Sequence, residues 1–461
     1  MTGWRRMFPH RPDRYTHPRI PTGTGARSAP VRTAVCAVVG ASFIAGCGVL
    51  PGDPGGSREP LTVMTWAPVG TKATNMAGMP AMAQAYARWV NANGGLAGRD
   101  LNVLTCNEHN TPTGAADCAR KAVAAGAVAV IGSYSQHGRA FMAPLETAGI
   151  PYIGGYGVSS EEFKSALSYP VNGGQPALLA GNGRQLARDC ERVALVRPDT
   201  LPGDSMSALL NAGLTGGKNK AAVDIVAAED ASDYSEPARE ALGAAGADPA
   251  LPARIGTAAA REKAAKGCVT AVLGERTETF FDSFRRMESK DQKVRISSVL
   301  GSVSQDLINS TGGKNGPFEG AYVTGWYPVS SDPLWDRMKG VIRDHAFGDD
   351  RIDPADTGVQ TTWIAYSVFS EITKRLADGE ISARKVARAL DRAEGVATGG
   401  LTPPLSWRYE DMRAVTGFPR IVNGQVTFQL VREGRLVALA DGGDSGSMDM
   451  TQTLENAPGP I

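Results

Sequence analysis

The sequence predicts an α/β protein with two lobes, each a parallel β-sheet flanked by helices, and a ligand cleft between the lobes. Short apolar runs of strand length alternate with amphipathic helical segments through most of the 461 residues. Continuous apolar runs are typical of strands buried on both faces, and their alternation with helices indicates a parallel sheet. A break at Asn172-Gly173-Gly174 separates two such sets of comparable length. Clefts between domains are favoured ligand sites, so we expect one here.

The first set opens at Leu61 and contains four repeats of strand and loop, with helices between them. Apolar residues at helical spacing indicate its helices, and flanking Gly or Pro residues indicate where each segment begins and ends. Thr111 or Thr113 is the expected N-cap of the second helix. The predicted strands are Leu61–Trp66, Leu101–Cys106, Ala127–Ile131 and Pro151–Ile153, and the predicted helices are Met76–Asn93, Pro112–Ala125 and Gly138–Ala148.

The second set follows the same alternation of short apolar runs and helical segments. Its predicted helices are Leu178–Leu186, Asp204–Leu214, Glu236–Ala245 and Thr277–Met287. Its predicted strands are Val193–Val196, Val223–Val226, Cys268–Leu273 and Arg295–Val299.

The remainder of the chain is expected to be shared between the lobes. The strand-like run Gly320–Tyr327 is expected to return the chain to the first lobe. Apolar and polar residues alternate over residues 420–439, which predicts a β-hairpin. The first lobe is then 61–176 with 321–402, and the second is 177–320 with 403–440. Residues 441–461, rich in Gly, Ser and Asp, are predicted to be disordered. Three helices are predicted in the last third, at Pro333–Phe347, Thr357–Asp378 and Ser382–Glu394.

The chain's net charge of +1 hides an uneven distribution. Residues 1–46 carry seven arginines and one acid, or +6, so the rest of the chain carries −5. No basic patch occurs in that remainder, which disfavours nucleic acid as a partner.

The amino terminus has the order of a bacterial export signal. A basic region ends at Arg32, and the apolar run Ala34–Ala45 is too short to span a bilayer but suits a signal peptide. Ile44-Ala45-Gly46-Cys47 resembles the lipobox of lipoproteins, whose cysteine is acylated. We therefore expect residues 1–46 to be a signal peptide, Cys47 to be lipidated and 47–60 to form a flexible tether. An ordinary signal peptide with an incidental cysteine is the alternative.

The six cysteines suit an exported protein. Cys36 would leave with the signal peptide, and Cys106, Cys118, Cys190 and Cys268 remain for two disulfides. The sequence allows three pairings of these four. We favour Cys106–Cys118, from a strand end to the following helix, and Cys190–Cys268, between the starts of two strands.

Polar and small residues follow two successive strands of the first set and predict a binding site. Ser133, Tyr134 and Ser135 follow one strand, and Gly154, Gly155 and Tyr156 follow the next. Ligands of open parallel sheets bind beyond the carboxyl ends of the strands, where such loops offer N–H groups and hydroxyls. The alternative is that Ser133 and Ser135 merely cap a helix.

No catalytic, metal or cofactor site is expected. The Gly443-Asp444-Ser445-Gly446 motif resembles the nucleophile region of a serine protease, but no matching His context accompanies it. No P-loop and no dinucleotide fingerprint follows a strand, and His109, His137 and His345 are dispersed. These observations favour a binding protein without a cofactor over an enzyme.

Several motifs together resemble the branched-chain amino-acid-binding (Leu/Ile/Val-binding) family, the solute-binding lipoproteins of ABC importers. The turn Asn91–Arg99 (NANGGLAGR) is similar to that family's N-x-x-GG-x-x-GR turn. In order along the chain follow Cys118–Lys121, Ile131-Gly132 with Ser135, Trp363 with Ala365-Tyr366, and Gly399–Pro404. The resemblance covers roughly residues 61–440.

This resemblance implies the type I periplasmic-binding-protein fold, with two Rossmann-like lobes that close over a ligand. Family ligands are often amino acids, and the loops at 133–135 and 154–156 would hold their carboxylate. Glu275, after the strand Cys268–Leu273, would meet their ammonium group, although it could also be a solvated acid paired with Arg276. Trp66, at the end of the first strand, is expected at the cleft, where stacking on a ligand and packing between lobes are equal possibilities.

The function expected from these features is capture of a small polar metabolite, an amino acid or a related compound, for an ABC importer. The protein is expected as a monomer, lipid-anchored at the outer face of the cell membrane, with an ABC permease as partner. A sensory lipoprotein that reports to a membrane receptor is the alternative, and an enzyme on the same scaffold is a third possibility.

Overall fold

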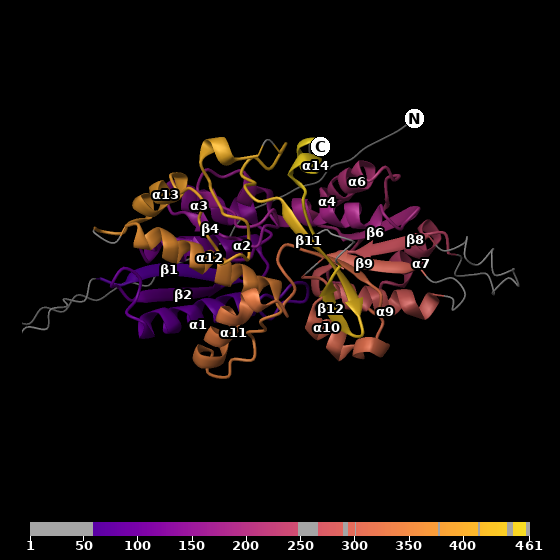
Figure 1. Ribbon diagram of the computed structural model, residues 1–461, viewed down its shortest axis with the longest axis horizontal. Helices are drawn as coiled ribbons and strands as arrows, with labels where there is room; N and C mark the ends of the chain where they lie inside the picture. The colour runs from indigo at the N-terminus through magenta and orange to yellow at the C-terminus, as the bar shows by residue number, and fades with distance from the viewer. Residues whose placement is uncertain are drawn as a thin grey trace, which may run out of the picture. The chain divides into compact units, whose positions relative to one another are not determined.

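The computed structural model describes residues 59–247, 266–288, 294–299, 301–376, 379–413, 415–439 and 446–457. The chain from Ser57 onward forms one compact unit. Within that unit the strands build two separate sheets with helices packed against them, as Figure 1 shows. The predicted α/β class, with two sets of strands and helices, is confirmed.

The first sheet, with the helices that cover it, is the first lobe. Its strand order is β2-β1-β3-β4-β5, and every neighbouring pair is parallel. Parallel strands buried on both faces need apolar side chains, which the runs beginning at Leu61 and Val130 provide. Its strands are β1 (Leu61–Ala67), β2 (Leu101–Asn107), β3 (Val130–Ile131), β4 (Tyr152–Ile153) and β5 (Ser168–Tyr169).

The second sheet, with its helices, is the second lobe. Its strand order is β12-β11-β10-β9-β8-β6-β7, and β13 pairs with β11. The strands from β7 to β10 are parallel, and β11 turns the edge antiparallel. Its strands are β6 (Arg192–Pro198), β7 (Val223–Ala227), β8 (Gly267–Ala271), β9 (Arg295–Val299), β10 (Tyr322–Gly325), β11 (Gln425–Arg432), β12 (Arg435–Ala438) and β13 (Ser447–Asp449).

Helices begin and end where local signals place them. The Thr111 hydroxyl accepts a hydrogen bond from the N–H of Gly114 at the start of α2, so Thr111 is the N-cap, and Gly149 ends α3 in the left-handed region. The helices are α1 (Gly78–Ala92), α2 (Pro112–Ala124), α3 (Gly138–Ala148), α4 (Gly174–Leu186), α5 (Leu201–Asp204), α6 (Met206–Gly216), α7 (Ser235–Ala244), α9 (Thr277–Met287), α10 (Gln305–Ser310), α11 (Asp336–His345), α12 (Thr357–Lys374), α13 (Ala383–Asp391) and α14 (Thr451–Glu455). Short 3₁₀ turns are η1 (Ser160–Phe163), η2 (Gly274–Arg276), η3 (Gly313–Asn315), η4 (Pro333–Trp335) and η5 (Tyr409–Asp411).

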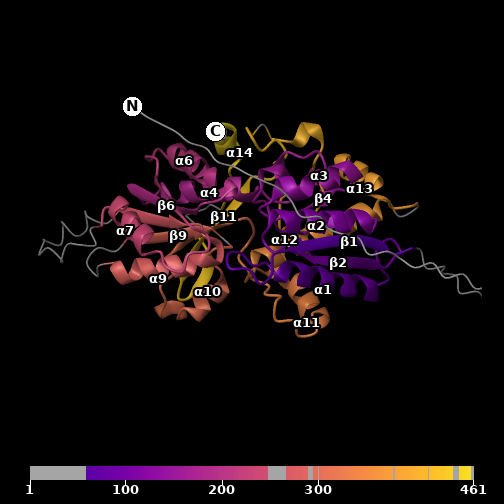
Figure 2. The same cartoon turned by 180° about the vertical axis from the view of Figure 1, so that it is seen from behind.

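The chain passes between the two sheets three times, after β5, after β10 and after α13. Helices α11 and α12 pack on α1 of the first lobe, and Figures 1 and 2 show these orange helices beside the indigo strands. Strand β10 lies between β9 and β11 in the second sheet, so the predicted return to the first lobe at residue 321 is wrong. The return follows Gly325, because the apolar run itself completes the second sheet.

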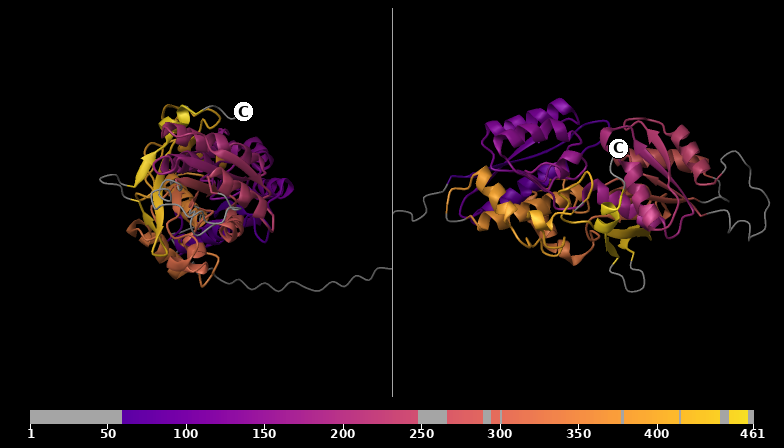
Figure 3. Two further views of the ribbon diagram at one scale, coloured as in Figure 1. Left: turned by 90° about the vertical axis from the view of Figure 1, so that its right-hand side faces the viewer. Right: turned by 90° about the horizontal axis from the view of Figure 1, so that it is seen from above.

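The carboxyl-terminal segment is more ordered than the sequence predicts. Residues 446–457, expected to be disordered, contain β13 and α14. The N–H of Met450 donates to the Gly424 carbonyl at 2.9 Å, and α14 packs on α4 and α6. Figure 3 shows this yellow segment against the second lobe. The rest of the predicted tail, at 441–445 and 458–461, lies outside the described residues.

Both predicted disulfides are confirmed. Cys106 at the end of β2 is bonded to Cys118 in α2. Cys190, just before β6, is bonded to Cys268 at the start of β8, and it joins two neighbouring strands of the second sheet.

The predicted signal peptide, the lipidated Cys47 and nearly all of the tether lie outside the described residues. Among the helices of the described part, none combines the length and the apolar character that a membrane crossing needs.

Candidate functional site

A cavity of about 100 Å³ lies where the carboxyl ends of both sheets face each other. Its lining comes from segments that follow strands β1, β3, β4, β6, β7, β8, β9 and β10, together with α4. Loops at the carboxyl ends of parallel strands are the usual ligand site of such sheets. The lining residues are Thr74, Met76, Tyr134, Gln136, Tyr156, Val158, Gln175, Leu178, Leu179, Pro198, Thr200, Pro202, Met206, Glu229, Val272, Leu273, Gly274, Val299, Gly301, Ser302 and Trp326.

Three aromatic side chains form one connected wall of this cavity. The rings of Tyr134 and Tyr156 meet edge to face at a centroid distance of 5.2 Å, and Tyr156 meets Trp326 in the same way at 5.1 Å. The indole N–H of Trp326 donates to the Gly174 carbonyl at 2.9 Å, which fixes the orientation of the ring. The wall therefore joins both lobes and presents rigid aromatic surface to a ligand.

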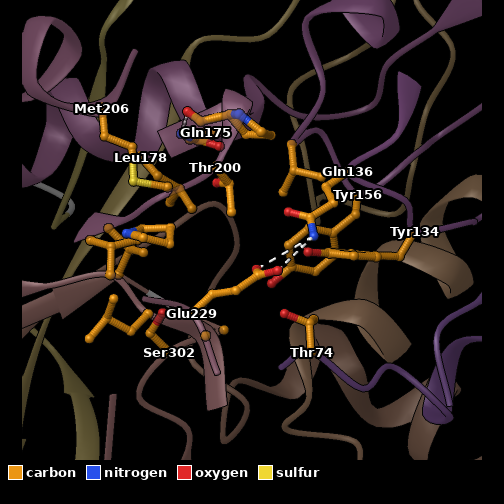
Figure 4. Close-up of a pocket in the computed structure, with 18 of the residues that line it drawn as sticks. Thr74, Tyr134, Gln136, Tyr156, Gln175, Leu178, Thr200, Met206, Glu229 and Ser302 are labelled. Atoms are coloured by element: carbon orange, nitrogen blue, oxygen red, sulfur yellow. Dashed lines mark hydrogen bonds between the residues drawn. The ribbon is translucent and has the colours of Figure 1, made fainter. Parts of the chain in front are cut away.

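Glu229 is the only acidic or basic side chain among the described residues that line the cavity. It follows β7, and Figure 4 shows it reaching toward Gln136, Tyr134 and Tyr156. The Gln136 amide nitrogen lies 3.5 Å from both carboxylate oxygens of Glu229 and donates to Asn110 at 2.9 Å. The Gln136 amide thus bridges the lobes between an anchored partner in the first and a carboxylate in the second.

Burial keeps the tyrosine hydroxyls of the wall protonated. It raises the pKa of Tyr134 above its ordinary value, and the nearby carboxyl groups of Glu108 and Glu229 add to the rise. The pKa of Tyr156 is raised well above 10, first by burial. Both phenols therefore stay neutral and can donate a hydrogen bond at physiological pH.

Of the residues predicted for ligand binding, Tyr134 and Tyr156 lie in the cavity wall. Ser133 and Ser135 lie behind it, fully buried. The Ser133 hydroxyl accepts from the N–H of Trp66 at 3.1 Å, and the Ser135 hydroxyl donates to the Glu108 carboxyl at 3.0 Å. Both serine hydroxyls are thus engaged within the protein. The Ser135 oxygen also accepts from the N–H of His137, but His137 is itself the N-cap of α3 and the helix has no side-chain cap, so neither serine caps it.

Trp66 is a core residue and does not line the cavity. Its side chain is fully buried and packs against Phe141 at 5.4 Å and Tyr152 at 5.9 Å, between ring centroids. The expectation that it faces the cleft fails because successive side chains of a strand point to opposite faces of the sheet. The side chain of Trp66 takes the face covered by α2 and α3.

Gly154 and Gly155 serve close packing. A Cβ atom on Gly154 would come within 2.4 Å of the Ala365 Cβ, and one on Gly155 within 2.1 Å of the Glu162 carboxyl. The N–H of Gly154 donates to the Tyr169 carbonyl in the sheet. Neither glycine is among the residues that line the cavity.

Glu275 lies at the rim, where it contacts the opposite lobe. Its carboxylate accepts hydrogen bonds from the Asn75 backbone N–H at 3.1 Å and from the Asn75 side-chain amide at 2.9 Å. Its neighbour Arg276 donates to the Lys72 carbonyl at 3.0 and 2.6 Å. We call Glu275 and Arg276, with the loop Thr71–Asn75, the interlobe latch. The side chain of Glu275 is exposed, and Gly274 takes the adjoining place in the lining.

Sequence reasoning missed Glu229, Gln136 and the apolar residues of α4. Glu229 stands two positions beyond the end of β7, so the strand-end rule that selected the loops of the first set also applies to it, whereas Glu275 came from the family resemblance. Gln136 directly follows the predicted Ser133–Ser135 run.

Comparison with known proteins places the chain in a family. The sequence profile of a periplasmic binding protein family matches residues 64–419. No curated protein sequence matches the chain.

Solved structures share the fold at low sequence identity. A possible leucine/isoleucine/valine-binding protein from Rhodopirellula baltica has a TM-score of 0.66 and 14% identity, over 84% of this chain and 98% of that one. A solute-binding protein of an ABC transporter from Rhodopseudomonas palustris, in complex with p-hydroxybenzoic acid, has a TM-score of 0.66 and 14% identity, over 87% and 100%. A fatty acid ABC transporter substrate-binding protein from Thermomonospora curvata has a TM-score of 0.65 and 14% identity, over 88% of this chain and 97% of that one.

These likenesses agree with the two-lobed architecture described above. Because the family profile spans most of the chain, the protein belongs to the periplasmic binding protein family, in line with the resemblance seen in its sequence.

Proposed function

We propose that this protein is the extracellular, lipid-anchored solute-binding component of an ABC importer. It captures a small polar metabolite, an amino acid or a related compound, and delivers it to a membrane permease. It does so as a monomer, by binding and without chemistry. The observation that carries the proposal is the cavity, which is lined from the strand ends of both lobes.

Three further points support this function. The chain belongs to a family of periplasmic binding proteins, and similar folds include solute-binding proteins of ABC transporters. The sequence Ile44–Cys47 follows an apolar run, as in lipoproteins. Hydrogen bonds across the cavity rim, from Arg276 and to Glu275, join the lobes and would be made on closure over a ligand. A ligand that binds the closed state more tightly shifts the lobes toward it.

A thermal-shift screen of the purified protein tests solute binding. Amino acids, small amines and amides, nucleosides and aromatic acids are compared. A ligand at about 100 times its dissociation constant should stabilise the fold by roughly 2.7 kcal/mol. A shift with one class supports the proposal, whereas no shift with any class argues against solute capture.

Metabolic labelling with radioactive palmitate tests the anchor. Cys47→Ala should lose the label and leave the membrane fraction, because the acylated thiol is gone. Cys36→Ala is the matched control, since Cys36 lies within the apolar run before Cys47 and its loss should keep the label. Label that survives Cys47→Ala contradicts the lipid anchor at this residue.

A further inference from the structure

No basic side chain that could hold an anion is among the described residues that line the cavity. Among the described residues that line it, the polar groups are hydroxyls and amides, and the one charge is the Glu229 carboxylate. A carboxylate ligand placed here would face a like charge in a partly dehydrated site, where repulsion is stronger than in water. The charge of the lining thus favours a cationic ligand.

Several of the groups expected to hold a ligand carboxylate already have partners within the protein. The hydroxyls of Ser133 and Ser135 bond to Trp66 and Glu108. The backbone N–H groups at 134, 154 and 156 donate to the carbonyls of residues 66, 169 and 133, at 3.0, 2.9 and 3.0 Å. A ligand carboxylate at these groups would have to break bonds that the folded protein already makes.

The anion-binding turn after β4 is filled by the protein itself. The backbone N–H groups of Gly157, Val158 and Ser159 converge on the Glu162 carboxyl at 3.0, 3.1 and 2.9 Å, and the Ser159 hydroxyl donates to it at 3.1 Å. Successive N–H groups in a turn make an anion site, and an internal carboxyl group now occupies this one. Val158 lines the cavity, so the filled turn stands at its wall.

The Glu229 carboxylate, in contrast, keeps capacity to accept hydrogen bonds. Within the described part of the chain, the bonds found for it come from Gln136 alone, both at 3.5 Å. N–H···O bonds are ordinarily 2.7–3.2 Å long, so these contacts leave room for a stronger donor. The Gln136 amide donates a hydrogen bond to the Asn110 side-chain oxygen at 2.9 Å. Its position shows where a hydrogen-bond donor can approach Glu229.

The surroundings of Glu229 suit a cation with an apolar body. Tyr134 and Tyr156 lie beside the carboxylate in Figure 4, and aromatic faces attract cations. The opposite wall, with Leu178 and Met206, is aliphatic. A cavity of about 100 Å³ is smaller than the roughly 150 Å³ cavity that binds benzene, which limits the enclosed body to one small ring or branched chain.

We infer that the ligand is a small organic amine with an aromatic or branched aliphatic body and no carboxylate, and that Glu229 recognises its ammonium group. This inference rests on the proposed solute-binding function and narrows it. A charge-assisted N–H···O bond to Glu229 would replace the long contacts from Gln136. The Glu229 carboxylate would repel the free carboxylate of an amino acid, and the turn at Gly157–Ser159 is already occupied by Glu162.

Isothermal titration calorimetry with two matched sets of probes tests the inference. The aromatic set is 2-phenylethylamine, phenylalanine and 3-phenylpropanoate, and the aliphatic set is 3-methylbutylamine, leucine and 4-methylpentanoate. Within each set the body is kept and only the charged groups change. We expect the amine of at least one set to bind ten times more tightly than the amino acid, with no binding of the acid.

Two outcomes overturn the inference, and they differ in what they say of the proposed function. Tighter binding of an amino acid or an acid keeps solute capture but refutes amine recognition. Absence of binding by all six probes refutes the amine assignment and also counts against solute capture.

A pair of variants then tests the residue. Glu229→Gln keeps the shape and removes the charge, and should weaken amine binding at least tenfold. Asp230→Asn, the exposed neighbour outside the lining, makes the same charge change and should alter affinity less than twofold. Urea unfolding of both variants checks that the fold is retained. Equal effects of the two variants, or an unchanged affinity in Glu229→Gln, contradict the role of Glu229.

Discussion

At the scale of single residues, a buried carboxyl group at position 108 links folding to pH. Glu108 follows β2, is fully buried, and accepts hydrogen bonds from Ser135 and from the N–H of Asn110. Burial raises its pKa from 4.5 to about 7, against the opposing effect of these two bonds. The folded state therefore holds this proton more tightly than the unfolded state does.

The raised pKa predicts that stability falls as pH rises. The contribution of Glu108 is fully present below pH 4.5 and is lost as pH increases through about 7. The shift corresponds to about 3 kcal/mol of unfolding free energy. Burial also raises the pKa of Glu162 to about 7, so both carboxyl groups lower the unfolding free energy as pH rises, and their effects add.

Urea unfolding at pH 5 and pH 8 measures this effect. Glu108→Gln should reduce the pH dependence by about half, because one of the two titrating groups is gone and Glu162 remains, whereas the exposed Glu278→Gln should leave it unchanged. A Glu108→Gln variant with the full slope of the parent protein would disprove the assignment.

At the scale of secondary-structure elements, the two disulfides differ in the length of chain that they close. Cys106–Cys118 closes 12 residues between β2 and α2, and Cys190–Cys268 closes 78 residues between the starts of β6 and β8. In the chain-entropy account the longer loop restricts the unfolded state more, by roughly 4.5 against roughly 3 kcal/mol. Replacing each pair by serine and measuring urea unfolding should give this order. A larger loss for the shorter loop would show that strain or packing governs both.

The interlobe latch predicts a general effect on affinity. Glu275→Ala removes two hydrogen bonds across the rim, each worth about 0.5–1.5 kcal/mol, and so weakens closure. Every ligand should lose affinity by a similar factor, roughly 5- to 100-fold, since the cavity lining itself is unchanged. Glu278→Ala, which replaces an exposed acid in the first turn of α9, is the control and should bind normally. Calorimetry with an amine and an amino acid separates this uniform loss from the selective loss expected for Glu229→Gln.

Elements with strong local patterns were predictable from the sequence. Helix α9 was expected at Thr277–Met287 and is found there, because its apolar face and flanking signals are local. Strand β5 was missed, since Ser168–Tyr169 becomes a strand only through pairing with β4. The place of β10 was also wrong, because an apolar run does not tell which sheet it completes.

The position of the cavity was predictable from the sequence, but its lining residues only in part. The strand-end rule led to Tyr134 and Tyr156 in the cavity wall. It could not show that Trp66 points to the core, because both faces of β1 are apolar. The rule also could not tell whether Glu275 or Glu229 lines the cavity, because both follow strand ends. Only the path of each loop places the Glu229 carboxylate in the cavity and the Glu275 carboxylate at its rim.

At the scale of the whole molecule, the two lobes form one cavity, the candidate ligand site, that neither contains alone. The first lobe supplies Tyr134, Tyr156 and Gln136, and the second supplies Glu229 and Trp326. The three connections between the sheets keep the lobes adjacent, and Asn172 in the first connection bonds to Tyr327 in the second at 2.9 Å. In the proposed function, closure of the lobes would assemble the aromatic wall and the carboxylate around the ligand.

A crystal structure of the protein grown with 2-phenylethylamine tests this account most directly. We predict the ring against Tyr156 and Trp326, the ammonium nitrogen about 2.7–2.9 Å from the Glu229 carboxylate, and Glu162 still seated in its turn. A ligand bound outside the cavity, or one whose ammonium group avoids Glu229, would contradict the account.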